Sequence, residues 1–266
     1  MNTFRSWWRK APAYQALDEP VGKQHTRYFE YCTFLTIGIA QLYSYNCLLA
    51  ASDYFNQRLI GNGGLQNALQ SSIVSVSTCT SLVAMVMLAK FQKNASYPYR
   101  LTTSLIMNFL AFLALAIFCL IWSSGGDGVY FIALLAITFT SAFSTSLSQN
   151  AVFSFINGYP AEEGVLYIQS VLTGQAVAGI LPSIAQIVAV LTVEEGRKTT
   201  SSQSNSFAYF LISSIFSLLA MLMFIGVMKR SHMQRRETHE EHPTIPLLVL
   251  FRKLKVLIFT IFFCFA

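Results

Sequence analysis

Six long apolar blocks interrupt this chain, and they constrain its fold more than any other feature of the sequence. The blocks lie at 30–52, 69–89, 101–122, 129–156, 165–191 and 206–228. A helix needs about 20 apolar residues to cross ~30 Å of hydrocarbon. None of the blocks holds Lys, Arg, Asp or Glu away from its ends. We therefore predict an all-α integral membrane protein, with a six-helix transmembrane bundle over residues 29–228.

Composition and the chain ends support the same interpretation. Only 11% of the residues are charged, whereas soluble domains carry about 25%. The first block is longer than the apolar core of a signal peptide, and no small-residue cleavage site follows it, so we predict that it is retained. A last apolar stretch at 256–266 is too short to span a membrane, and we expect the chain to end inside an incomplete seventh helix.

The distribution of Lys and Arg predicts the orientation in the membrane. Fifteen of them fall on one side of the predicted spans and three on the other. The richer side includes the N-terminal tail, residues 1–28, and a basic loop at 229–255. Because Lys and Arg concentrate in cytoplasmic loops, we expect both segments to be cytoplasmic in a multi-pass protein.

The sequence offers no sign of catalysis, cofactor binding or nucleic-acid binding. It contains no P-loop, Gly-x-Ser-x-Gly or His-Glu-x-x-His pattern and no buried acid–base pair. His239 and His242 lie in a hydrophilic loop, where a solvated charge run explains them better than a metal site. No basic helix face appears. The five cysteines lie inside apolar blocks, and we predict no disulfide.

Polar side chains recur at helical spacing within several spans. Gly38, Gln41, Tyr45 and Leu49 share one face of the first span, with Asn46 beside it. Similar stripes occur on the second, fourth and fifth spans: Ser71, Ser75 and Thr78; Thr138, Ser141, Thr145 and Gln149; and Gln175, Gly179, Pro182 and Gln186. Hydroxyls commonly bond to their own or a neighbouring helix. An unpaired amide in hydrocarbon costs roughly 2–7 kcal/mol, so the amides must face either a helix partner or a shared polar cavity.

The fifth span also carries signs of close packing. Ser170, Gly174 and Ala178 are spaced by four and form a groove of small residues. Pro182 removes one backbone hydrogen bond in mid-span and should kink the helix. Structural packing and a flexing transporter helix both explain this pattern.

Four segments resemble the equilibrative nucleoside transporter family. In the first span, Leu42, Asn46, Tyr54 and Phe55 match the family's Leu-Pro-Trp-Asn motif and the Tyr-Phe pair after it, with Ser-Tyr in place of Pro-Trp. The run 173–186, Thr-Gly-Gln-Ala-Val-Ala-Gly-Ile-Leu-Pro-Ser-Ile-Ala-Gln, is similar to the fungal form of the family's fifth-helix signature. Gln149 and Asn150, with Phe153 and Pro160 after them, resemble the fourth-helix motif, and 251–255 resembles the entry to helix 7.

This resemblance implies the first half of an eleven-helix, major-facilitator-like carrier that moves nucleosides or nucleobases by alternating access. Residues at the matched positions would border the substrate: Leu42, Tyr45, Asn46, Leu49 and Gln149. Others would serve helix packing and movement: Gly174, Gln175, Gly179 and Pro182. The lipid bilayer would be that of the plasma membrane or the vacuole.

Two alternatives stay open. The chain could be a non-transporting truncated relative, acting as a membrane partner or as an inactive gene product, or it could be a receptor-like or channel bundle. The fifth-helix run favours the transporter family over a receptor. Because alternating access needs two bundles, we expect residues 1–266 alone not to transport and to require a missing C-terminal half or a dimer.

Overall fold

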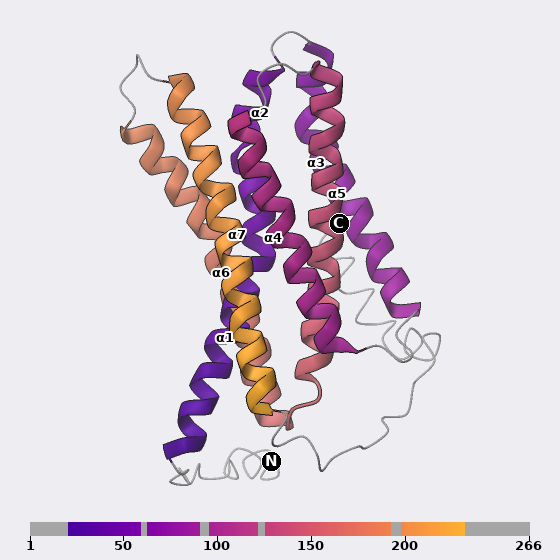
Figure 1. Ribbon diagram of the computed structural model, residues 1–266, viewed down its shortest axis with the longest axis vertical. Coiled ribbons are helices and arrows are strands. Elements are labelled where there is room, and N and C mark those ends of the chain that lie inside the picture. The colour runs from indigo at the N-terminus through magenta and orange to yellow at the C-terminus, as the bar shows by residue number, and fades with distance from the viewer. Residues whose placement is uncertain (1–20, 60–62, 91–95, 122–125, 193–197, 232–266) are drawn as a thin grey trace, which may run out of the picture. The chain divides into compact units, whose positions relative to one another are not determined.

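The computed structural model describes residues 21–59, 63–90, 96–121, 126–192 and 198–231. Within those ranges the chain forms seven α-helices (Figure 1). They are α1 (Val21–Ala50), α2 (Ser52–Arg58), α3 (Gly63–Lys90), α4 (Tyr97–Ile121), α5 (Asp127–Ile156), α6 (Ala161–Thr192) and α7 (Lys198–Ser231). Most of the predicted N-terminal tail and basic loop, and all of the predicted incomplete seventh helix, lie outside the described residues.

Six of these helices are long and apolar enough to cross a membrane. The candidate spans are Arg27–Ala50, Gly63–Leu88, Tyr97–Leu120, Asp127–Ile156, Ala161–Ile184 and Ser206–Lys229. The prediction of an all-α membrane protein with six spans is therefore confirmed. The boundaries differ most at the starts of α1, α3 and α7. These helices begin nine, six and eight residues before the predicted starts at 30, 69 and 206.

The short helix α2 lies in the connection between the first two predicted spans, where the apolar blocks predict no helix. Tyr54 and Phe55 of α2, and Leu59 after it, are all buried. They belong to the same core cluster as Leu69 and Ile73 of α3. Burial of these apolar side chains stabilises the turn of helix between the two spans.

The closest helix pair is α1 with α6, and glycines allow the approach. A Cβ atom built on Gly174 would lie 2.1 Å from the carbonyl oxygen of Leu35. A Cβ built on Gly38 would lie 2.1 Å from the carbonyl oxygen of Val171. The two backbones are thus in direct contact at both glycines, as expected for helices that associate in lipid through small residues.

Aromatic clusters fill the bundle interior on either side of this contact. Phe34 of α1 packs against Phe155 and Tyr167, with ring centroids 6.3 and 5.0 Å away. Phe55 of α2 stacks on Phe210 of α7, with the ring centroids 5.8 Å apart. These clusters hold α1 in the interior of the bundle, where its central turns carry polar side chains.

Candidate functional site

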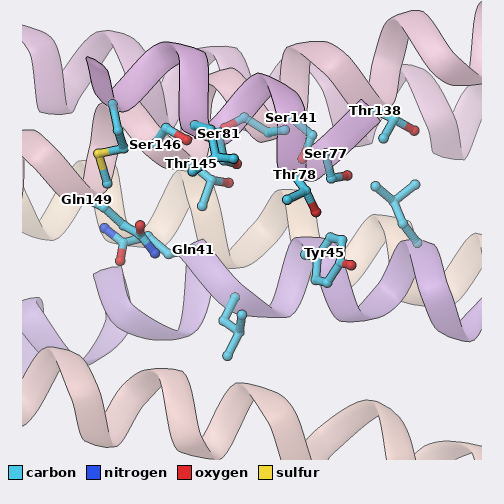
Figure 2. Close-up of a pocket in the computed structure, with 15 residues that line it drawn as sticks. Gln41, Tyr45, Ser77, Thr78, Ser81, Thr138, Ser141, Thr145, Ser146 and Gln149 are labelled. Carbon is cyan, nitrogen blue, oxygen red and sulfur yellow. Dashed lines mark hydrogen bonds between the residues drawn. The ribbon is translucent and has the colours of Figure 1, made fainter. Parts of the chain in front are cut away.

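A cavity of about 390 Å³ lies between α1, α3 and α5 (Figure 2). Ten of its fifteen lining residues are polar, and none is charged. The lining residues are Gln41, Leu42, Tyr45, Leu48, Ser77, Thr78, Ser81, Leu82, Met85, Thr138, Ser141, Ala142, Thr145, Ser146 and Gln149. The volume falls within the range of about 300–1,000 Å³ typical of small-molecule sites.

Helical periodicity explains the α1 wall of this cavity. Gln41, Leu42, Tyr45 and Leu48 recur at intervals of one, three and three residues, so they share one face of the helix. Figure 2 shows Gln41 close to Gln149 at one end, with Tyr45 farther along the same helix, below Thr78. The α1 wall therefore combines an amide, an aromatic ring and two leucines.

Hydroxyl groups from α3 and α5 line the rest of the cavity, and their bonding differs. Thr138 Oγ1 donates to the carbonyl of Leu134 at 2.9 Å, within its own helix. Ser146 Oγ does the same to Ala142 at 2.9 Å. Ser77 Oγ is buried and has no hydrogen-bond partner among the residues that the structure describes. An unmade hydrogen bond at a buried group costs about 1–3 kcal/mol.

Three helices meet at the Gln41 side chain. Gln41 Nε2 donates to Ser148 Oγ of α5 at 2.8 Å. Gln175 Nε2 of α6 donates to Gln41 Oε1 at 3.0 Å. The side chain of Gln41 is almost fully buried, yet it lines the cavity. Its amide is therefore held in one orientation from both sides.

A second polar network, centred on Asn108 of α4, lies behind the cavity wall. Asn108 Nδ2 donates to Ser44 Oγ at 2.8 Å and to Ser217 Oγ at 2.9 Å. Its Oδ1 accepts from Ser144 at 3.4 Å and from Ser141, a cavity residue, at 3.5 Å. One amide thus connects α1, α4, α5 and α7. The sequence analysis overlooked Asn108, although it is the sole amide in the apolar block 101–122.

We expect Asn108→Leu to lower the free energy of unfolding by only about 1 kcal/mol. Ser44 and Ser217 also donate to carbonyls of their own helices, at 3.0 and 3.1 Å, so neither hydroxyl proton would lose its acceptor. The measurement is thermal unfolding in detergent. Asn67→Leu, on the exposed face of α3, is the control and should change stability less. A loss as large as 4 kcal/mol, by order of magnitude the cost of breaking a buried ion pair, would contradict this account.

The residues predicted to border a substrate lie in three different environments. Leu42, Tyr45 and Gln149 line the cavity. Asn46 lies outside it and donates through Nδ2 to the carbonyl of Ala178 at 3.2 Å, which connects α1 to α6. Leu49 packs against the apolar core. The structure therefore brings three of the five together.

The residues predicted for helix packing also differ from one another. Gly174 lies in the backbone contact between α1 and α6, whereas a Cβ on Gly179 would meet no atom within 4 Å. Gln175 bonds to Gln41 across the helix pair. Pro182 is buried inside α6. Close approach of two backbones therefore occurs at the first glycine of this run and not at the second.

The polar stripe predicted on the second span is displaced in the structure. Of Ser71, Ser75 and Thr78, only Thr78 lines the cavity. Ser71 is exposed and donates to the carbonyl of Ala68 in its own helix at 3.0 Å. The cavity face of α3 instead carries Ser77 and Ser81, which the sequence analysis did not single out.

Comparison with known proteins points to one family. A family model described as "Nucleoside transporter" matches residues 134–243. Nucleoside transporter FUN26 of Saccharomyces cerevisiae is 28% identical over 188 residues, which cover 70% of this chain and 35% of the relative. Equilibrative nucleoside transporter 4 of Homo sapiens is 27% identical over 251 residues, which cover 88% of this chain and 43% of the relative. The chain thus spans less than half of the length of these curated relatives.

Proposed function

We propose that the chain is a member of the nucleoside transporter family and that its bundle supplies one wall of the substrate site of a membrane carrier for nucleosides or nucleobases. The observation that carries this proposal is the cavity between α1, α3 and α5, where ten of fifteen lining residues carry a neutral polar group and none is charged. A nucleoside is neutral, planar and rich in hydrogen-bonding groups, so its chemistry matches that lining.

Individual lining residues supply the contacts that such a substrate needs. The ring of Tyr45 offers a face on which a base can stack. The amide of Gln149 has two N–H donors and an acceptor oxygen for the polar edge of a base or for the ribose hydroxyls. The unpartnered hydroxyl of Ser77 adds a further donor and acceptor. Neutral contacts keep binding weak enough for release, which a carrier requires.

The transport step itself needs a second bundle. Carriers of this kind move substrate by rocking two helical units around a site at their interface. The cavity described here is lined from α1, α3 and α5 alone. We therefore propose that this bundle recognises the substrate, and that movement requires an opposing bundle that closes over the same cavity.

Tyr45→Ala and Gln149→Ala should each weaken nucleoside binding about 2- to 13-fold, the equivalent of one hydrogen bond worth roughly 0.5–1.5 kcal/mol. The measurement is equilibrium binding of labelled adenosine and labelled uridine to the chain reconstituted in lipid nanodiscs.

Tyr99→Ala and Gln169→Ala are the matched controls for these two variants. Both side chains are exposed, on α4 and α6, and neither lines the cavity. Both should leave the dissociation constants unchanged. Unchanged affinity in Tyr45→Ala and Gln149→Ala, or a wild-type chain that binds neither nucleoside, would overturn the proposed function.

A further inference from the structure

We infer that Gln41 reads the hydrogen-bonding edge of the base and that Gln175, on the neighbouring helix, positions the Gln41 amide for this contact. The inference rests on the proposed function, because it assigns a further contact within the same cavity. Gln41 lines the cavity together with Tyr45 and Gln149, whereas Gln175 does not line it.

The hydrogen-bonding capacity of Gln41 is only half used by the protein. A carboxamide has two N–H donors and two acceptor lone pairs. One donor is directed to Ser148 Oγ at 2.8 Å, and one lone pair accepts from Gln175 at 3.0 Å. One donor and one lone pair are left over. The Gln41 side chain is 2% exposed, and the cavity that it lines is where a solute could meet these two groups.

The bond from Gln175 goes with one of the two orientations of the Gln41 amide. Because Gln175 donates to Gln41, the oxygen of the Gln41 amide faces α6 and the nitrogen faces α5. Ser148 alone would not fix this arrangement, since a hydroxyl can donate or accept. Without Gln175 the amide could rotate by half a turn and exchange its donor and acceptor. Gln175 is therefore a positioning residue, and Gln41 is the residue that touches the substrate.

A fixed amide suits a base with a donor and an acceptor on adjacent atoms. Adenine offers its amino group beside a ring nitrogen, and glutamine pairs with this edge elsewhere in recognition of adenine. Purine riboside has the same ring and ribose but lacks the amino group. Gln41 should therefore favour adenosine over purine riboside. Purine riboside has no amino group to donate an N–H to the Gln41 amide oxygen.

The test is competition against labelled adenosine on the reconstituted chain. The measured quantity is the ratio of the half-displacing concentration of purine riboside to that of adenosine. We expect a ratio above one in the wild type, and Gln41→Met should lower it by about two- to tenfold, as for the loss of one hydrogen bond. Gln175→Met should lower the ratio less. The double variant should match Gln41→Met alone, because Gln175 acts through Gln41.

Gln169→Met is the matched control, since Gln169 is exposed on α6 and does not line the cavity. It should leave the ratio unchanged. The ratio compares two ligands on the same protein sample, so it can still be measured for a variant with a lower yield of folded protein. A ratio unaffected by Gln41→Met, in a chain that binds adenosine, would overturn this inference alone. A wild-type chain that binds no nucleoside would overturn the proposed function itself.

Discussion

Gly174→Ala should greatly lower the yield of folded protein. We expect the free energy of unfolding to fall by about 3 kcal/mol, the upper end of the range for adding a methyl group to a well-packed interior. The added methyl group would lie 2.1 Å from the Leu35 carbonyl oxygen and 3.0 Å from the Ile39 amide nitrogen. Both atoms belong to the backbone of α1 and cannot rotate away. The helices α1 and α6 must therefore separate, and their other contacts would loosen with them.

Separation of α1 from α6 would also disturb the cavity, because hydrogen bonds between these helices hold a residue that lines it. Gln175, next to Gly174 in the chain, holds the Gln41 amide at 3.0 Å. Asn46 donates to the Ala178 carbonyl across the same interface. Both bonds depend on the spacing of α1 and α6, so nucleoside binding should fall together with stability.

Gly179→Ala is the matched control. It changes the same residue type in the same helix, but the new Cβ would meet nothing within 4 Å. In an unhindered helix, alanine is favoured over glycine by about 1 kcal/mol. Gly179→Ala should therefore be neutral or stabilising in the 266-residue chain. Thermal unfolding and the yield of monodisperse protein compare the two variants, and equal stability of both would show that the backbone contact is not what Gly174 provides.

The membrane spans could be predicted from the sequence, because the bilayer restricts what a chain can do. Backbone groups in hydrocarbon must be paired within the segment, so an apolar block of about 20 residues has few alternatives to a helix. The connection that contains α2 lacks this constraint. Its helix depends on burial of Tyr54 and Phe55 against α3, and such a tertiary contact leaves no periodic pattern in a segment of seven residues.

The cavity could be predicted in part. Periodicity placed Tyr45 on the cavity face of α1 and Gln149 on the cavity face of α5, because both belong to polar stripes that recur at helical spacing. On α3, hydroxyls occur at seven of the eleven positions from Ser71 to Ser81. Helical spacing alone cannot select among so many, and the packing of α3 against α5 decides which of them reach the cavity.

The roles of the amides could not be predicted, because their partners are far away in the sequence. Gln41 and Gln175 are 134 residues apart, and Asn108 and Ser217 are 109 apart. The sequence analysis treated helix bonding and cavity lining as alternatives for each amide. Gln41 does both, since two of its hydrogen-bonding positions tie helices together while its side chain lines the cavity.

Protection of a thiol inside the cavity tests the central claim most directly. The experiment uses Thr145→Cys, in a chain whose five native cysteines are replaced by serine, and a small water-soluble thiol reagent. Thr145 lines the cavity on α5 (Figure 2). Asn67→Cys, exposed near the start of α3 and outside the apolar block at 69–89, is the control position. The rate of labelling is measured in membranes with and without adenosine.

Adenosine at about ten times its dissociation constant should slow labelling of Thr145→Cys about tenfold, because roughly one cavity in eleven is then empty. Labelling of Asn67→Cys should proceed at the same rate with and without adenosine. Uridine should protect as adenosine does, whereas sucrose should not. Equal labelling of Thr145→Cys with and without saturating nucleoside would contradict the claim that the cavity between α1, α3 and α5 holds the substrate.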